Sequence, residues 1–299
     1  MEVTIQMKRL LAVIGGDARY LELIRQLRKL PDTTTLLVGY DKLEKGFTEA
    51  AKHMDFSDLD PSELDVVILP ITGTDKDGKV EVVFSNQKIV LTENWFKKLK
   101  ESAIVFTGMS SPYLTKQMEQ AKATFAPLLD RDDVAIYNSI PTAEGTIMMA
   151  MQHTDYTIHS SRVIVTGFGR VGNTVANKFS ALGAKVSVAA SSIHDLARIT
   201  EMGLTAIPLD EVHEHTKTCD ILINTIPAKV IKKDSIQQLP SHALIFDLAS
   251  IPGGTDFEYA EQRGIKAILA RSLPGVVAPK TAGKILADVI KQILMKRGE

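Results

Sequence analysis

Short apolar runs alternate with longer amphipathic stretches along the whole chain. In the first half the runs cover residues 10–14, 35–38, 66–69, 104–107 and 134–137. In the second half they cover residues 163–166, 185–189, 221–225, 244–247 and 267–269. Strands of a buried parallel sheet have short, continuous apolar runs in their sequences. Regular alternation of such runs with helical stretches is typical of βαβ units. The pattern therefore predicts two mainly parallel sheets, one in each half of the chain.

Three amphipathic stretches predict helices at defined places. After the first run a glycine pair permits a tight turn, and apolar residues then recur every three or four positions over 20–30, as in a helix packed on the sheet. Pro141 and Thr142 precede the stretch 143–158, which predicts a helix capped by the threonine and bridging the two halves. A last stretch, 281–294, predicts a helix that packs back across the cleft between the halves.

A glycine-rich segment follows the first apolar run of the second half. The order is strand, three glycines, helix and next strand, which is the dinucleotide-binding fingerprint in its proper context. The first glycine allows the tight turn, the second lets the backbone approach a pyrophosphate, and the third lets the helix lie close to the sheet. We expect this segment to bind the cofactor through Gly167, Phe168, Gly169, Arg170, Val171 and Gly172. Arg170 is equally explained as a solvated charge in the first helical turn.

The end of the next strand decides between the two nicotinamide cofactors. An acidic residue there would accept hydrogen bonds from the ribose hydroxyls of NAD, but the chain has Ala190, Ser191 and Ser192. Without a carboxylate nothing repels a 2′-phosphate, and Arg198 follows in the next helix as a cation. The sequence favours NADP, while NAD stays possible if the serines only cap that helix.

Polar residues also follow two later strands, at the edge where the nicotinamide should lie. These residues are Asn224, Thr225, Ile226 and Pro227 after one strand, and Asp247, Leu248 and Ala249 after the other. Asp247 has an alternative role as a cap of the glycine-containing turn that follows it. We therefore predict two Rossmann-like, doubly wound α/β domains with an interdomain cleft. The expected divisions are an N-terminal substrate or partner domain (1–141), a bridging helix (142–160), an NAD(P)-binding domain (161–278) and a C-terminal helix (279–299).

Composition and charge exclude several classes of function. The 299 residues carry 35 Lys and Arg against 36 Asp and Glu, a net charge of -1, so no basic field attracts nucleic acid. The longest uncharged run, 102–115, is shorter than the roughly 18 apolar residues that a membrane span needs. Cys219 is the only cysteine, which excludes an internal disulfide and suits a reducing cytoplasm. We expect no metal at the acidic run 210–215, because on a helix its two histidines would point about 200° apart.

Four segments of the chain resemble the A-type polypeptides of dipicolinate synthase from spore-forming bacteria. They read PTAEG from Pro141, the glycine fingerprint, HDLARI from His194, and LPG followed by APKTAG from Leu273. The resemblance spans nearly the whole chain. It implies NAD(P)-linked oxidation of dihydrodipicolinate to dipicolinate in the mother-cell cytoplasm during sporulation. It also implies a partner, the flavoprotein-like B-type polypeptide of dipicolinate synthase, and we expect homo-oligomers as well.

A substrate with two carboxylates needs cations or amide and hydroxyl donors in the cleft. Our candidates are Arg19, Thr107, Gly108, Ser110, Asn138, Ser139, Arg271 and Lys280. Glu144 and His153 are the candidate catalytic residues, because they are titrating groups near the expected cleft.

Two other functions stay open. A D-specific 2-hydroxyacid dehydrogenase also has two similar domains, but that family places an arginine after the strand 244–247 and a histidine in the loop 272–275, and both are missing here. A noncatalytic cofactor-binding protein is the other alternative.

Overall fold

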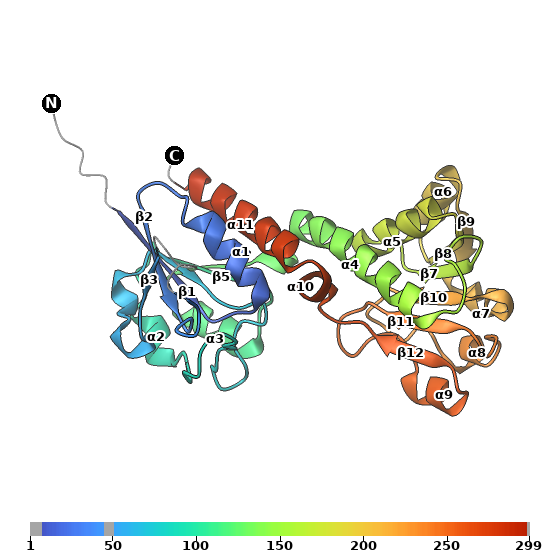
Figure 1. The fold of residues 1–299 in the computed structure, drawn as a ribbon, viewed down its shortest axis with the longest axis horizontal. Helices are drawn as coiled ribbons and strands as arrows, with labels where there is room; N and C mark the ends of the chain where they lie inside the picture. Colours follow the sequence, from blue (N-terminus) through green and yellow to red (C-terminus); the bar gives the residue numbers. More distant parts are fainter. Residues whose placement is uncertain (1–7, 45–50, 298–299) are drawn as a thin grey trace. The chain divides into compact units, whose positions relative to one another are not determined.

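The structure, a computed structural model, describes residues 8–44 and 51–297 of the chain. The fold consists of two compact units (Figure 1). The first unit joins Met1–Val134 to Pro279–Glu299, and the second is the continuous segment Ala135–Ala278. The chain thus enters the second unit once, leaves it once, and ends in the first.

The first unit is built on a six-stranded sheet with the order β3-β2-β1-β4-β5-β6, in which all neighbouring strands are parallel. This is the doubly wound order, in which the strand sequence reverses between the first and fourth strands. The strands are β1 (Arg9–Ile14), β2 (Thr33–Val38), β3 (Lys52–His53), β4 (Val66–Ile68), β5 (Ile104–Thr107) and β6 (Thr124–Pro127).

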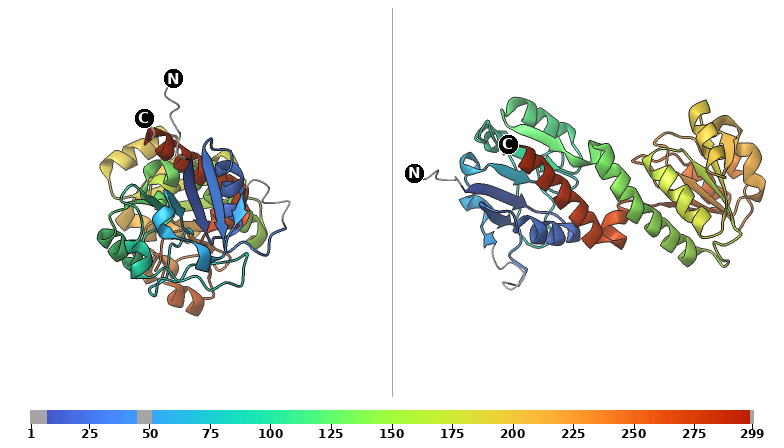
Figure 2. Two further views of the ribbon diagram at one scale, coloured as in Figure 1. Left: turned by 90° about the vertical axis from the view of Figure 1, so that its left-hand side faces the viewer. Right: turned by 90° about the horizontal axis from the view of Figure 1, so that it is seen from above.

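Helices cover both faces of this sheet. Side chains alternate along β1, so that Leu11 and Val13 face one core and Ala12 and Ile14 face the other. The first core is closed by α1 and α11, which lie side by side (Figures 1 and 2), and the second by α2 and α3. These helices are α1 (Ala18–Leu27), α2 (Glu93–Lys97), α3 (Pro112–Gln120) and α11 (Pro279–Lys296).

The second unit repeats the architecture with the order β12-β11-β10-β7-β8-β9, again all parallel. Its strands are β7 (Arg162–Thr166), β8 (Lys185–Ala190), β9 (Thr205–Pro208), β10 (Ile221–Asn224), β11 (Leu244–Asp247) and β12 (Lys266–Leu269). Its helices are α5 (Arg170–Ala181), α6 (Ile193–Glu201), α7 (Val212–His215), α8 (Lys233–Ile236), α9 (Phe257–Gln262) and α10 (Leu273–Val277), with most of α4 (Asp132–His153). Two Rossmann-like parallel sheets are therefore confirmed.

One predicted strand is wrong. Residues 134–137 lie within the first two turns of α4, and the sixth strand is β6 instead. A short apolar run fits a helix as well as a strand, and here only Val134 is buried while Ile136 and Tyr137 are about half exposed. Consequently α4 begins at Asp132 rather than after Thr142.

Pro141 lies inside α4. A proline inside a helix has no N–H to offer the preceding turn, so the Tyr137 carbonyl, four residues earlier, loses its usual helical donor. The adjacent Thr142 hydroxyl donates to a different carbonyl, that of Asn138 (2.8 Å). The other predicted strands are confirmed with ends shifted by one or two residues, and β3 and β9 were missed. Both are edge strands with few fully buried residues, which weakens the apolar signal.

An ion cluster fixes the amino edge of the second sheet. Asp220 precedes β10 and accepts hydrogen bonds from the Arg162 backbone (2.8 Å) and guanidinium (2.9 Å), and His242 Nε2 lies 3.0 Å from its carboxylate. Burial alone would raise the pKa of Asp220, but these hydrogen bonds outweigh it and lower the pKa to about 2.

This depressed pKa predicts a defined loss of stability in acid. Since the carboxyl has a higher pKa in the unfolded chain, its contribution is complete above about pH 5 and disappears as the pH falls toward 2. We expect the contribution to be about 2 kcal/mol. Denaturant titrations of the parent protein and Asp220→Asn between pH 6 and pH 2.5 should converge as the pH falls, and a constant difference would contradict this assignment.

Candidate functional site

The glycine turn after β7 lies at the switch point of the second sheet, between β7 and β10. Gly167 has φ +95°, and a Cβ there would lie 2.4 Å from Thr225 Oγ1. A Cβ on Gly172 would lie 2.1 Å from the Gly167 carbonyl oxygen. Both positions therefore require glycine for packing within the protein, whatever the unit binds.

Gly169 differs from these two glycines. Its φ of −75° suits any residue, and a Cβ there would meet nothing within 4 Å beyond its chain neighbours. It is the N-cap of α5 and provides no side-chain cap, so no capping side chain takes up the unpaired amides of the first helical turn. An open cradle at a helix N-terminus fits a pyrophosphate, which is what a nicotinamide dinucleotide would place there.

A buried chain of side chains crosses β7, β10 and β11 beside this turn. The Thr166 hydroxyl donates to Asn224 Oδ1 (2.8 Å), and Asn224 Nδ2 donates to Asp247 Oδ1 (3.0 Å). The Asp247 carboxylate also accepts from the backbone amides of Ala249 (3.1 Å) and Gly254 (2.7 Å). Asn224 and Asp247 have no solvent exposure, so their side chains fix the loops after β10 and β11. This geometry gives Asp247 the capping role.

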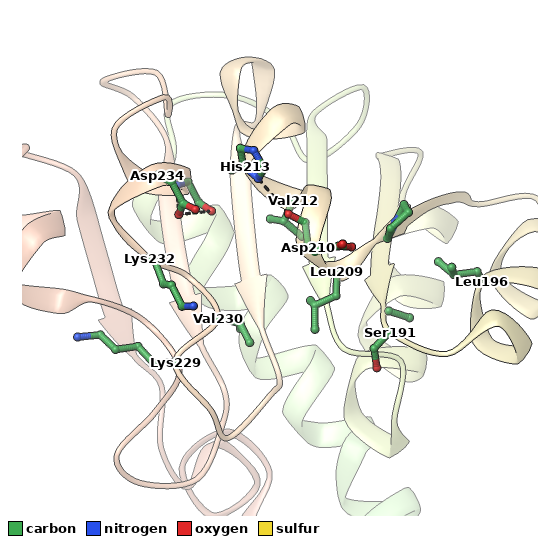
Figure 3. A pocket seen from close by; sticks show the side chains of 13 residues that line it. Ser191, Leu196, Leu209, Asp210, Val212, His213, Lys229, Val230, Lys232 and Asp234 are labelled. Atoms are coloured by element: carbon green, nitrogen blue, oxygen red, sulfur yellow. Dashed lines mark hydrogen bonds between the residues drawn. The ribbon is translucent and has the colours of Figure 1, made fainter.

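A pocket of about 570 Å³ opens at the carboxyl end of β8 (Figure 3). Ser191 lines it, whereas Ser192 caps α6 by accepting from the Asp195 amide. Arg198 does not line the pocket and pairs with Glu201 (3.0 Å). The opposite wall is the loop between β10 and α8, which contributes Lys229 and Lys232. The lining residues are Ala190, Ser191, Leu196, Pro208, Leu209, Asp210, Val212, His213, Lys229, Val230, Lys232, Asp234 and Ser235.

The predicted catalytic residues lie at different levels of α4, Glu144 near its middle and His153 at its C-terminal end. Glu144 is exposed, and its neighbour Gly145 approaches Leu273, just beyond the carboxyl end of β12. His153 Nδ1 lies 3.0 Å from the ammonium of Lys266, the first residue of β12. Because the strands are parallel, Glu144 lies toward the edge of the glycine turn and His153 lies at the opposite edge.

Three predicted substrate residues belong to the second unit. Ser139 is buried, and its hydroxyl lies 2.6 Å from Thr174 Oγ1 of α5. Asn138 is half-buried one position earlier in α4, and Arg271 is exposed after β12. Ser139 is committed to its contacts within the protein, which leaves Arg271 as the accessible cation of this group.

The other predicted substrate residues gather at the carboxyl edge of the first sheet. The Arg19 guanidinium pairs with Asp17 (3.0 Å), and the Thr107 hydroxyl donates to the Pro70 carbonyl (2.9 Å). A Cβ on Gly108 would lie 2.6 Å from Ile71 Cα, and the exposed Ser110 hydroxyl contacts Thr115. Lys280 is exposed in the first turn of α11.

The first sheet has its own glycine turn at the switch point, and this turn is covered by the chain. Gly16 donates to the Glu81 carbonyl (3.0 Å), and a Cβ on Gly15 would lie 2.4 Å from the same oxygen. Tyr20 donates to the Leu69 carbonyl (2.6 Å), and burial raises the pKa of that phenol. The segment around Glu81 thus takes the place where a pyrophosphate would lie.

Residues 8–44 and 51–297 show neither a cluster of metal ligands nor a helix suited to cross a membrane. No three His, Cys, Asp or Glu side chains in these ranges are grouped to hold a metal ion. None of their helices combines the length and apolarity needed to cross a membrane. Cys219 is buried beside its strand, and burial raises the pKa of its thiol to about 12.

Family comparisons agree with the two-unit division. Residues 10–129 match the model of the N-terminal domain of the A-type dipicolinate synthase polypeptide. Residues 136–250 match the NAD binding domain of D-isomer specific 2-hydroxyacid dehydrogenases. The second match includes both the glycine turn and the loops after β8 and β10.

Relatives and solved structures cover nearly the whole chain. The A-type dipicolinate synthase polypeptide of Bacillus subtilis (strain 168) is 51% identical over 284 residues, 95% of each chain. The crystal structure of its counterpart from Bacillus halodurans is 50% identical with a TM-score of 0.93, covering 96% of this chain and 98% of that one. The crystal structure of the Bacillus subtilis counterpart is 50% identical with a TM-score of 0.92, covering 97% and 96%. The chain therefore belongs to the family of A-type dipicolinate synthase polypeptides, and its second unit is an NAD-binding domain of the dehydrogenase type.

Proposed function

We propose that this chain oxidises dihydrodipicolinate to dipicolinate with NADP as the preferred hydride acceptor. The observation that carries the proposal is the open cradle at Gly169, at the N-terminus of α5 and at the switch point of a doubly wound sheet. The family membership supports the choice of substrate. The relatives are called dipicolinate synthases, and the product of the proposed reaction is the compound in that name.

The proposed reaction is a two-electron oxidation that balances without another reagent. A nicotinamide cofactor, when bound, would supply the acceptor for a hydride from the dihydropyridine-type ring. A base takes one proton, and the ring becomes an aromatic pyridine. Aromatisation supplies much of the driving force, so the protein's main task is to hold the ring in register and to provide one proton acceptor.

Residues of the second unit can perform these tasks. The amides at the start of α5 would bind the pyrophosphate, and the fixed loops after β10 and β11 would hold the nicotinamide end of the cofactor. Glu144 is the proposed proton acceptor, because it lies toward the carboxyl edge, and Arg271 is a cation for a substrate carboxylate. His153, at the other edge, has no part in this proposal.

We also propose that the chain works with a second, different polypeptide. The relatives are named as the A-type polypeptide of their synthase, which implies a B-type partner in those enzymes. We extend that assembly, together with self-association, to this chain.

A coupled assay tests the proposal. The full chain is mixed with dihydrodipicolinate and NADP or NAD, with and without the candidate B-type partner, and dipicolinate and reduced cofactor are followed together. We expect equal amounts of both products. Cofactor binding without turnover under all four conditions would instead support a noncatalytic cofactor-binding protein. Turnover when a 2-hydroxyacid replaces dihydrodipicolinate would support the dehydrogenase alternative.

Ser191→Asp should shift the cofactor preference toward NAD. A carboxylate at the end of β8 would accept hydrogen bonds from both ribose hydroxyls and repel a 2′-phosphate. We expect the ratio of the NADPH and NADH dissociation constants to change by on the order of tenfold. Ser192→Asp is the matched control, since Ser192 caps α6 and aspartate is an equally good cap. An unchanged ratio in Ser191→Asp would contradict this placement of the ribose.

A further inference from the structure

The loop between β10 and α8 carries a cation whose role the proposed reaction leaves open. Lys232 lines the pocket at the end of β8, on the wall opposite Ser191. Figure 3 shows its ammonium directed toward the middle of the pocket. Within residues 8–44 and 51–297, no carboxylate forms an ion pair with it. An exposed ammonium facing a hollow is available for an anion of the ligand.

The neighbouring cations are engaged elsewhere. Lys229 points away from the pocket in Figure 3, and its ammonium lies 3.4 Å from Asp256. The ammonium of Lys233 lies over the ring of Tyr259, 5.3 Å from its centroid, and Lys233 does not line the pocket. Arg198, which the sequence favoured, pairs with Glu201 outside the pocket. Lys232 is therefore the cation that best fits the pocket.

The rest of the pocket suits the adenosine end of a dinucleotide. In a doubly wound sheet the ribose lies at the end of the second strand, which is β8 in this unit. Leu196, Leu209, Val212 and Val230 provide apolar walls for a flat ring. The carboxylates in the pocket, Asp210 and Asp234, lie higher than Ser191 and Lys232 in Figure 3. Asp234 is also held at the start of α8, where it accepts from the Ser235 amide (2.7 Å).

We infer that Lys232 binds the 2′-phosphate of NADP and, together with Ser191, sets the preference for this cofactor. This inference rests on the proposed function, because it takes the second unit to bind a nicotinamide dinucleotide. The cation that contacts the 2′-phosphate is then Lys232 in the loop after β10, and not Arg198 in the helix after β8, which the sequence had favoured. Ser191 donates a hydroxyl hydrogen bond to the phosphate from the facing wall.

The test measures binding rather than turnover. Dissociation constants of NADPH, NADH, adenosine 2′,5′-bisphosphate and 5′-AMP are determined by calorimetry for the full-length parent protein, Lys232→Gln and Lys233→Gln. In Lys232→Gln we expect the two ligands with a 2′-phosphate to bind on the order of 10- to 100-fold more weakly. The affinities for NADH and 5′-AMP should stay within about twofold, because neither ligand carries that phosphate.

Lys233→Gln is the matched control. It removes the same charge from the adjacent position outside the pocket, so all four affinities should be unchanged. Equal losses for all ligands in Lys232→Gln, no loss in it, or the same loss in both variants would overturn the role of Lys232. A parent protein that binds NADH but not NADPH would also overturn it while leaving an NAD-linked oxidation intact. A parent protein that binds neither cofactor would overturn the proposed function as well.

Discussion

Gly169→Asp should abolish cofactor binding while leaving the fold intact. The backbone at this position is compatible with any residue, and a new side chain would enter open space. The carboxylate would stand at the helix N-terminus, where the pyrophosphate is expected, and would both fill that space and repel it. We expect the dissociation constant of NADPH to rise by on the order of 100-fold or more. The melting temperature should change by no more than about 2 °C.

Gly169→Asn separates bulk from charge. Asparagine has nearly the same shape as aspartate and is also a good N-cap, but it carries no charge. We expect it to weaken NADPH binding less than aspartate does. Gly172→Ala provides the opposite comparison, because its Cβ would approach the Gly167 carbonyl to 2.1 Å and should destabilise the fold itself. If Gly169→Asp bound NADPH as tightly as the parent protein, the glycine turn would be a structural feature only.

Asp247→Asn should strongly destabilise the second unit. The carboxylate accepts N–H hydrogen bonds from Asn224, Ala249 and Gly254 in a site with no solvent exposure. An amide at this position has one acceptor oxygen and brings two further N–H donors into a site that already holds only donors. We expect a loss of about 3 kcal/mol in the free energy of unfolding. For a unit of this size that corresponds to a drop of on the order of 6 °C or more in melting temperature.

Asp256→Asn is the control for this substitution. Asp256 caps α9 and is partly exposed, and asparagine can cap a helix as well as aspartate does. Its free energy of unfolding should change by less than about 1 kcal/mol. Urea unfolding of both variants, followed by far-UV circular dichroism, makes the comparison. Equal stability of Asp247→Asn and the parent protein would mean that the loop after β11 does not depend on this carboxylate.

The central strands and the glycine turn could be predicted from the sequence because their signals are local. Buried strands such as β10 are mostly apolar, with residues 221–223 facing two cores, and the glycine spacing reflects close approaches within a few residues. The edge strand Thr205–Pro208 escaped prediction because only one of its four side chains is fully buried. The run 134–137 was misassigned because its apolar residues carry no period that separates strand from helix.

The remainder of the site depends on contacts between distant parts of the chain. Nothing near Asp247 in the sequence indicates that its carboxylate accepts from Asn224, which lies on the neighbouring strand. Ser191 and Lys232 likewise line one pocket only because β8 and the loop after β10 meet at one edge of the sheet. The available signal was a group of lysines, Lys229, Lys232 and Lys233, in the segment that follows the predicted strand 221–225, and that pattern does not show which of them faces the ligand.

The placement of α11 in the first unit makes that unit discontinuous in sequence. Leu286, Val289, Ile290 and Leu294 complete the core around α1, although the whole second unit separates them in the chain from the strands that they cover. The second unit is a single uninterrupted stretch, so its sheet forms from strands that are close together in sequence. The first unit must instead bring together residues from both sides of the second unit, and closing so long a loop gives it the larger entropic cost of assembly.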